Sequence, residues 1–151
     1  MVAVIPVMAG VFVLATGISK MLSPEAFNEA VRAHALIPGW MTSAAVWVVP
    51  VGEAVIGGWA LWLIGVHQTV GRASLWLVVL FAVFAGYAGL LWLNPPASGS
   101  SCGCGWSEAP AAWASICARN LLMVGLLSGV LLVEQNSHRS VSWSVNAAGP
   151  P

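Results

Sequence analysis

The stretch "ASLWLVVLFAVFAGYAGLLWL", residues 73–93, contains no charged side chain. A helix needs about 20 predominantly apolar residues to cross the hydrocarbon core of a bilayer. The apolar residues of this stretch follow one another without the strict alternation that marks the strands of a membrane barrel. We therefore predict a transmembrane helix over residues 73–93.

Three further apolar segments of similar length lie at residues 2–22, 42–66 and 113–133. Hydrophobic residues make up 59% of the chain and charged residues only 7%, whereas a soluble domain carries about a quarter charged residues. The sequence predicts an all-α integral membrane protein with a four-transmembrane-helix bundle over residues 1–133. We expect a flexible polar tail over residues 134–151. Because Met1 to Gly17 lacks basic residues, we also expect a retained first helix rather than a cleaved signal peptide.

The segment "SPEAFNEAVRAHALIPGW", residues 23–40, predicts a short helix between the first two spans. Ser23 is a favourable N-cap and Pro24 suits the first helical position. Apolar residues gather near one face, which is typical of a helix lying in the membrane interface. We expect Pro38-Gly39 to end it. The net charge of the chain is zero, which argues against a nucleic-acid partner.

Tryptophans and small residues support a membrane bundle. Belts of Trp are typical of both membrane faces, and we expect two of them: Trp40, Trp92, Trp106 and Trp113 at one face, Trp62 and Trp76 at the other. Small residues four positions apart let membrane helices approach closely. Such pairs occur at Ala82/Gly86, Ala85/Gly89 and Gly125/Gly129. They predict a compact bundle and a surface through which copies of the chain could associate.

Polar residues inside the apolar spans are candidates for function. Glu53 lies within the second span, where a carboxylate costs roughly 2.5–3.5 kcal/mol on insertion scales. Arg119 and Asn120 lie in the fourth span, and Lys20 lies near the end of the first. We predict an Arg119–Glu53 or a Lys20–Glu53 link. Two alternatives stay open: Glu53 could be protonated and purely structural, and a lysine near a helix end usually extends to the interface.

Cys102 and Cys104 stand one residue apart in "SSCGCGW", residues 100–106, between the third and fourth spans. A disulfide in so small a ring would be strained, and strained or exposed disulfides are the labile or catalytic ones. Cys117 could relay electrons, or be a small buried apolar residue, as free cysteines often are. Two thiolates also suit a soft metal ion such as Cu(I) or mercury. His34, His67 and His138 share no spacing that predicts a metal site.

Several stretches together resemble the MauE/DoxX-like membrane family. They are, in chain order, "GISKML" (17–22), "HALIPGW" (34–40), "VVPVGEAVIGGWALWL" (48–63), "CGCGW" (102–106) and "ARNLLMV" (118–124). The family pattern has Phe after the second Cys, whereas here Gly105 follows Cys104 and Trp106 could replace the aromatic ring.

The resemblance implies a bacterial inner-membrane protein with both termini inside and the Cys loop on the non-cytoplasmic side. It implies a role in disulfide formation or maturation of an exported enzyme similar to methylamine dehydrogenase, with an exported thiol/disulfide protein as partner. An analogy with vitamin K epoxide reductase, another small thiol bundle, suggests a quinone as electron acceptor. The charges alone give no orientation, because Lys20 and Arg32 oppose Arg72 and Arg139.

Three functional hypotheses follow. The first is a membrane thiol–disulfide oxidoreductase or its accessory, with Cys102 and Cys104 as the reactive pair. The second is a soft-metal (Cu or Hg) binding or transport protein that uses the same pair. The third is a non-catalytic assembly factor whose cysteines are dispensable.

Overall fold

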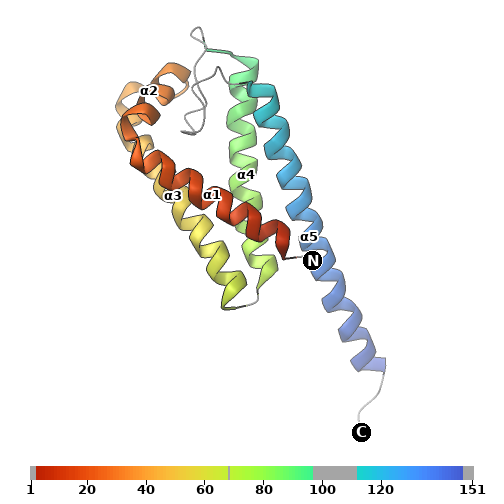
Figure 1. Ribbon diagram of the computed structural model, residues 1–151. Coiled ribbons are helices and arrows are strands. Elements are labelled where there is room, and N and C mark those ends of the chain that lie inside the picture. Colours follow the sequence, from red (N-terminus) through yellow and green to blue (C-terminus); the bar gives the residue numbers. More distant parts are fainter. Residues whose placement is uncertain (1–2, 68, 97–111, 148–151) are drawn as a thin grey trace.

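The computed structural model describes residues 3–67, 69–96 and 112–147 of the chain. All regular structure over these residues is helical. The helices are, in chain order, α1 (Val4–Leu22), α2 (Pro24–His34), α3 (Gly39–Gly65), α4 (Val70–Leu93) and α5 (Trp113–Ala147) (Figure 1).

Four of these helices are long and apolar enough to cross a membrane: α1, α3 and α4 over their whole lengths, and α5 from Trp113 to Ser137. Large apolar side chains remain exposed on all four, among them Met8, Val48, Val83 and Leu122. In water such a surface would be costly, whereas in a bilayer it faces lipid of the same character. The predicted four-span bundle of an integral membrane protein is therefore confirmed.

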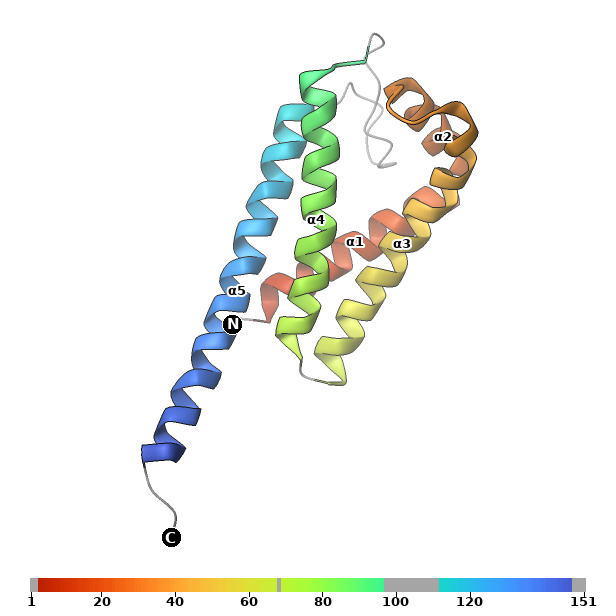
Figure 2. The same cartoon turned by 180° about the vertical axis from the view of Figure 1, so that it is seen from behind.

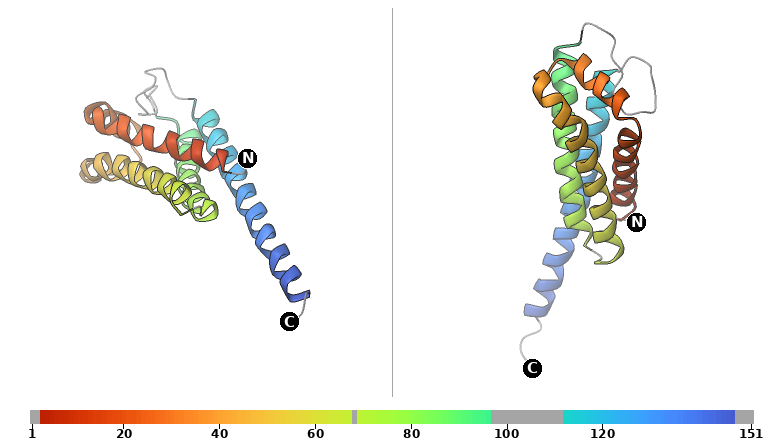
Figure 3. Two further views of the ribbon diagram at one scale, coloured as in Figure 1. Left: turned by 60° about the horizontal axis from the view of Figure 1, so that its bottom comes forward. Right: turned by 90° about the vertical axis from the view of Figure 1, so that its left-hand side faces the viewer.

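The spans form two pairs. Helix α1 packs along α3, helix α4 packs along α5, and the pairs meet mainly through α3 and α4 (Figures 1 and 2). Helix α2 lies across the end where α1 finishes and α3 begins, and the short link from α3 to α4 closes the opposite end (Figure 3). The C-terminal end of α4 and the first turn of α5 therefore lie at the α2 end.

Two glycines explain how closely α1 approaches α3. A Cβ added at Gly17 would lie 2.7 Å from the Ala54 nitrogen, and one added at Gly57 would lie 2.6 Å from the Leu14 nitrogen. Real Cβ atoms do not come so close to backbone, so only glycine lets the two helices meet here. By contrast, a Cβ at Gly125 or Gly129 would meet no described atom within 4 Å. Those two glycines do not pack within the bundle, and an oligomer through them stays a prediction.

The predicted short helix between the first two spans is confirmed as α2. Pro24 stands at its beginning, as expected, but Ser23 makes no capping hydrogen bond through its side chain. The helix ends before Pro38: Ala35 adopts a left-handed conformation with φ of 53°, which turns the chain toward α3. Its buried face consists of Phe27, Ala30, Val31 and His34.

Three helix boundaries differ from the sequence prediction, and in each case the helix is longer than the apolar segment. Helix α3 begins at Gly39 rather than at 42, and α4 begins at Val70 rather than at 73. Helix α5 continues to Ala147, so residues 134–147, expected as part of a flexible polar tail, continue the helix of the fourth span. Adding a residue to an existing helix gains a hydrogen bond without a new nucleation cost, so a helix can outlast its apolar segment.

The buried apolar core lies in the half of the bundle away from α2. It consists of Ala9, Val13, Ala60, Leu63, Ala73, Leu77, Phe81 and Leu127. Four of these residues are completely inaccessible: Ala60, Ala73, Leu77 and Leu127. This half is filled by side chains from all four spans, and it holds the two helix pairs together.

Candidate functional site

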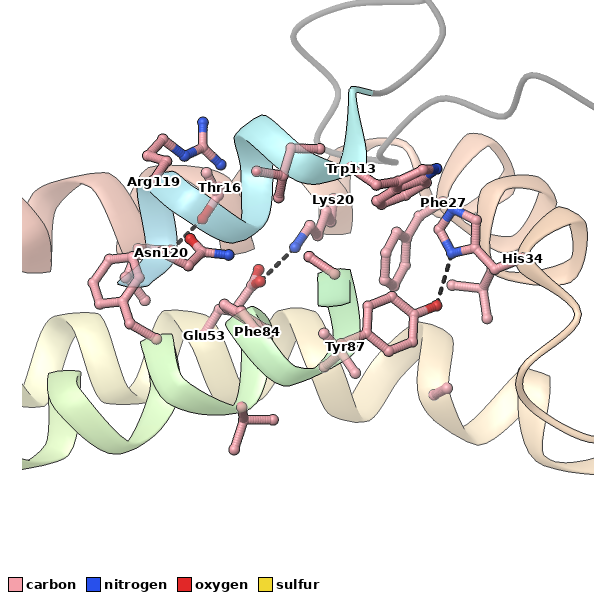
Figure 4. Close-up of a pocket in the computed structure, with 18 of the residues that line it drawn as sticks. Thr16, Lys20, Phe27, His34, Glu53, Phe84, Tyr87, Trp113, Arg119 and Asn120 are labelled. Atoms are coloured by element: carbon pink, nitrogen blue, oxygen red, sulfur yellow. Dashed lines mark hydrogen bonds and ion pairs between the residues drawn. The ribbon is translucent and has the colours of Figure 1, made fainter. Parts of the chain in front are cut away.

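A cavity of about 230 Å³ lies between the two helix pairs, in the half of the bundle nearest α2. Most of its wall is apolar or aromatic, but every helix adds at least one polar side chain: Thr16, Lys20, His34, Glu53, Tyr87, Arg119 and Asn120 (Figure 4). All four residues that the sequence suggested for a polar interior are thus brought to one space.

The centre of this cavity is an ion pair between the Lys20 Nζ and the Glu53 Oε1. The side chains are 8% and 1% exposed, so both charges are removed from solvent and lipid. Gly17 and Lys20 share one face of α1, since residues three apart lie side by side on a helix. Because Gly17 packs against the Glu53 Cβ, Lys20 on the same face of α1 lies beside the Glu53 carboxylate. Lys20 therefore does not extend to the interface, which was the open alternative.

Aromatic rings surround the lysine. The Lys20 Nζ lies 5.3 Å from the centre of the Phe27 ring and 5.6 Å from that of Phe84. Both distances fall within the range in which a cation is attracted to a ring face. The ammonium is thus stabilised by one carboxylate and two rings.

Glu53 itself is only half satisfied. Its Oε1 accepts from Lys20, whereas its Oε2 is buried and has no hydrogen-bond partner among the described residues. A buried polar atom without a partner costs roughly 1–3 kcal/mol. Asn120, which is also buried, faces the same cavity (Figure 4). The free carboxylate oxygen is therefore an acceptor available to a molecule in the cavity.

Arg119 occupies a different position from the one that the alternative link required. It is exposed, and its guanidinium carbon lies 5.5 Å from the centre of the Phe12 ring at the cavity edge. Within the described part of the chain, Glu53 pairs with Lys20 and not with Arg119. The reason is the orientation of α5: Asn120 is buried and Arg119, the residue before it, is exposed, and consecutive helix residues point in different directions.

A second polar group lies nearer α2, and sequence reasoning missed it. The His34 Nδ1 and the Tyr87 hydroxyl are 2.7 Å apart, and the His34 ring meets the Trp113 ring edge-on at 4.9 Å between centres. His34 is buried. Trp113, for which we expect a place in an aromatic belt, also lines the cavity. Tyr87, the only tyrosine of the chain and placed within an apolar span, was the available signal.

Of the three cysteines, the structure describes Cys117. Cys102 and Cys104 lie outside the described residues. The Cys117 Sγ lies 3.5 Å from the Ala85 carbonyl oxygen, to which it donates, so it faces α4 rather than the cavity. Within the described ranges, no three His, Cys, Asp or Glu side chains come close enough together to hold a metal ion.

Comparison with known proteins gives one match. No curated protein and no solved structure matches the chain. The model of the family described as methylamine utilisation protein MauE matches residues 1–133, which includes all four candidate spans except the last residues of α5. The broader link to DoxX-like proteins stays a prediction. Because the match covers well over half of its length, the chain belongs to the MauE family.

Proposed function

We propose that this chain is a membrane thiol–disulfide redox protein, or an accessory to one, in which Cys102 and Cys104 exchange disulfides with an exported partner. Membership of the MauE family suggests a role in methylamine utilisation. The partner would accordingly be an enzyme, or a thiol protein acting on an enzyme, that matures outside the cytoplasm and resembles methylamine dehydrogenase.

The single observation that carries this proposal is that described residues on both sides of the Cys segment line the cavity. Trp113, the first residue of α5, belongs to the cavity wall, and so does Tyr87 near the end of α4. Helix α4 ends and helix α5 begins at the α2 end of the bundle, so the segment that carries Cys102 and Cys104 leaves and rejoins the described structure there (Figure 1).

The chemistry follows from the spacing of the pair. A thiolate attacks a disulfide sulfur, forms a mixed disulfide with the partner, and is released when the neighbouring thiol attacks in turn. Two cysteines separated by a single glycine are suited to this second attack, because the resolving thiol is always close by. The strain of the small ring favours passing the disulfide on rather than keeping it.

The buried Lys20–Glu53 ion pair would support this exchange by taking part in proton transfer. An ionisable residue inside a membrane span is expensive and is by default a candidate for function. Lys20 and Glu53 are held together by the close α1–α3 contact, and proton uptake or release by thiols at the α2 end would have acceptors and donors within the same half of the bundle. We further propose that this end faces the non-cytoplasmic side of the bacterial inner membrane.

Trapping of mixed disulfides tests the proposal directly. In cells that mature the exported enzyme, one of the variants Cys102→Ser and Cys104→Ser should accumulate a mixed disulfide visible on a non-reducing gel. The other should form none, because it lacks the attacking thiol. The matched control is Cys117→Ser, whose thiol faces α4 and whose loss should leave exchange unchanged.

Other outcomes would favour the two remaining hypotheses. If the double variant Cys102→Ser/Cys104→Ser still supports maturation of the enzyme, the chain acts as an assembly factor without thiol chemistry. If the purified chain instead holds about one Cu(I) or Hg(II) per cysteine pair and forms no mixed disulfide, the soft-metal hypothesis replaces the redox one. Alkylation of Cys102 and Cys104 by a membrane-impermeant reagent in intact cells tests the orientation.

A further inference from the structure

We propose that the cavity between the two helix pairs binds a single lipophilic ring of the quinone and hydroquinone class, with a ring hydroxyl donating to the Glu53 Oε2. The inference rests on the shape and chemistry of the cavity wall.

The size and lining of the cavity suit a ring. An engineered apolar cavity of about 150 Å³ is known to hold benzene, and this one measures about 230 Å³. The space left over corresponds to a few substituents on a ring. Phe27, Phe84, Tyr87 and Trp113 provide aromatic surfaces around it, and aromatic rings pack favourably edge-on or offset against one another.

The polar groups specify where oxygen atoms would bind. The Glu53 side chain is 1% exposed, its Oε2 is unpartnered among the described residues, and an ionised carboxylate only accepts hydrogen bonds. A hydroquinone brings the donor that this oxygen lacks, whereas a quinone, which carries only acceptors, depends on the other groups of the cavity wall. The His34–Tyr87 pair lies further along the cavity (Figure 4), where a hydroxyl can donate or accept. Polar groups at two places in an apolar cavity match a ring with oxygens at opposite ends.

The cavity is also reachable from the bilayer. Phe12 and Val83 line it, yet they are 40% and 61% exposed on the outer surface of the spans. In a membrane this surface is in contact with lipid. A ligand dissolved in the hydrocarbon region would therefore enter without crossing water, which favours a lipophilic ring over a small polar solute.

One consequence rests on the proposed function. When two thiols close a disulfide, two S–H bonds break, one S–S bond forms, and two protons and two electrons are released. A quinone that takes up both protons and both electrons gains two O–H bonds and becomes a hydroquinone. The bound ring would thus be the electron acceptor for the thiol pair, and the hydroquinone would return to the lipid.

Binding is measured with the full chain in lipid nanodiscs, using duroquinone and its hydroquinone as probes and empty nanodiscs as the reference for partitioning. We expect saturable binding of about one ring per chain. Ala88→Leu, which adds bulk to the cavity wall, should weaken binding of both probes at least tenfold. The matched control is Ala82→Leu on the exposed side of the same helix, which should bind both probes as the natural chain does.

A second variant tests the hydrogen bond rather than the space. Glu53→Gln keeps the size of the side chain but replaces the free acceptor by a group that can donate. It should weaken binding of the hydroquinone about tenfold and that of the quinone much less, because the quinone carries only acceptors. Equal losses for both probes would overturn the assigned role of Oε2.

The inference is overturned if the natural chain binds no more of either probe than empty nanodiscs do. It is overturned equally if Ala88→Leu binds like the natural chain. The thiol proposal stands or falls separately: Cys102→Ser should bind both probes normally even though its disulfide exchange is impaired. A chain that traps the exported partner but binds no ring would retain the proposed function and lose this inference alone.

Discussion

At the end of the bundle where α3 turns into α4, apolar side chains from all four spans fill the interior. At the end covered by α2, the same four helices leave a cavity of about 230 Å³ around an ion pair. The first end is built like the core of an ordinary helical protein. The second gives up apolar packing for charged and hydrogen-bonding groups, which is costly in a membrane and makes this end the candidate functional site.

The largest effect is expected at the polar end, from Lys20→Met. Removing one partner of a buried pair leaves the other charge uncompensated, and the cost is typically about 3–5 kcal/mol. The midpoint of thermal unfolding in detergent should fall strongly. The double variant Lys20→Met/Glu53→Leu should recover most of the loss, because no isolated charge remains. If Lys20→Met is as stable as the natural chain, the polar end does not depend on the ion pair.

A core truncation at the apolar end should cost nearly as much. Leu77 is completely buried in the core, and Leu77→Ala should lower the free energy of unfolding by about 2–5 kcal/mol through lost contacts and the cavity left behind. Leu75→Ala, two residues earlier and facing outward, is the matched control and should cost far less. Binding of the quinone probes should be unaffected by Leu77→Ala in the folded protein. A selective loss of binding would show that the two ends are not separate.

Helices α1 and α3 run through both ends of the bundle. The variant Gly57→Ala tests how closely these two helices pack. An added Cβ would meet the backbone of Leu14 at 2.6 Å, so α1 must shift away from α3. Overpacking of this kind typically costs about 1–3 kcal/mol. Gly58→Ala is the control, since a Cβ there meets nothing within 4 Å, and it should be neutral or slightly stabilising. Similar unfolding midpoints for the two variants would contradict the close contact.

The smallest effect is expected from Tyr87→Phe, which removes the hydroxyl 2.7 Å from the His34 Nδ1. A single hydrogen bond contributes about 0.5–1.5 kcal/mol, so the unfolding midpoint should fall only slightly. The free energy of binding of the hydroquinone probe should change more than the free energy of unfolding does. A change in stability larger than that of Gly57→Ala would mean that the His34–Tyr87 pair is mainly structural.

The spans and the short helix could be predicted from the sequence because membrane insertion depends on composition over about 20 residues. The Lys20–Glu53 link could be foreseen only as one of two options. Choosing between Lys20 and Arg119 requires knowing how closely α1 approaches α3, and this depends on Gly17 and Gly57 rather than on the charged residues themselves.

Other parts of the site could not be read from the sequence. The contact of His34 with Tyr87 could not be foreseen, because the two residues are 53 positions apart. The spacing of small residues pointed to Gly125 and Gly129, yet such spacing is common in helices rich in glycine and alanine, and these two face outward. Pairings between distant helices are set by the packing of the whole bundle.

Gly17 has one further consequence. A Cβ at this position would lie 2.8 Å from the Pro50 carbonyl oxygen and 3.0 Å from the Glu53 Cβ. The spacing between the two opposite charges therefore depends on the close backbone contact at Gly17, a residue with no side chain and no charge. In a library of random substitutions selected for activity, position 17 should accept fewer replacements than the walls of the cavity do.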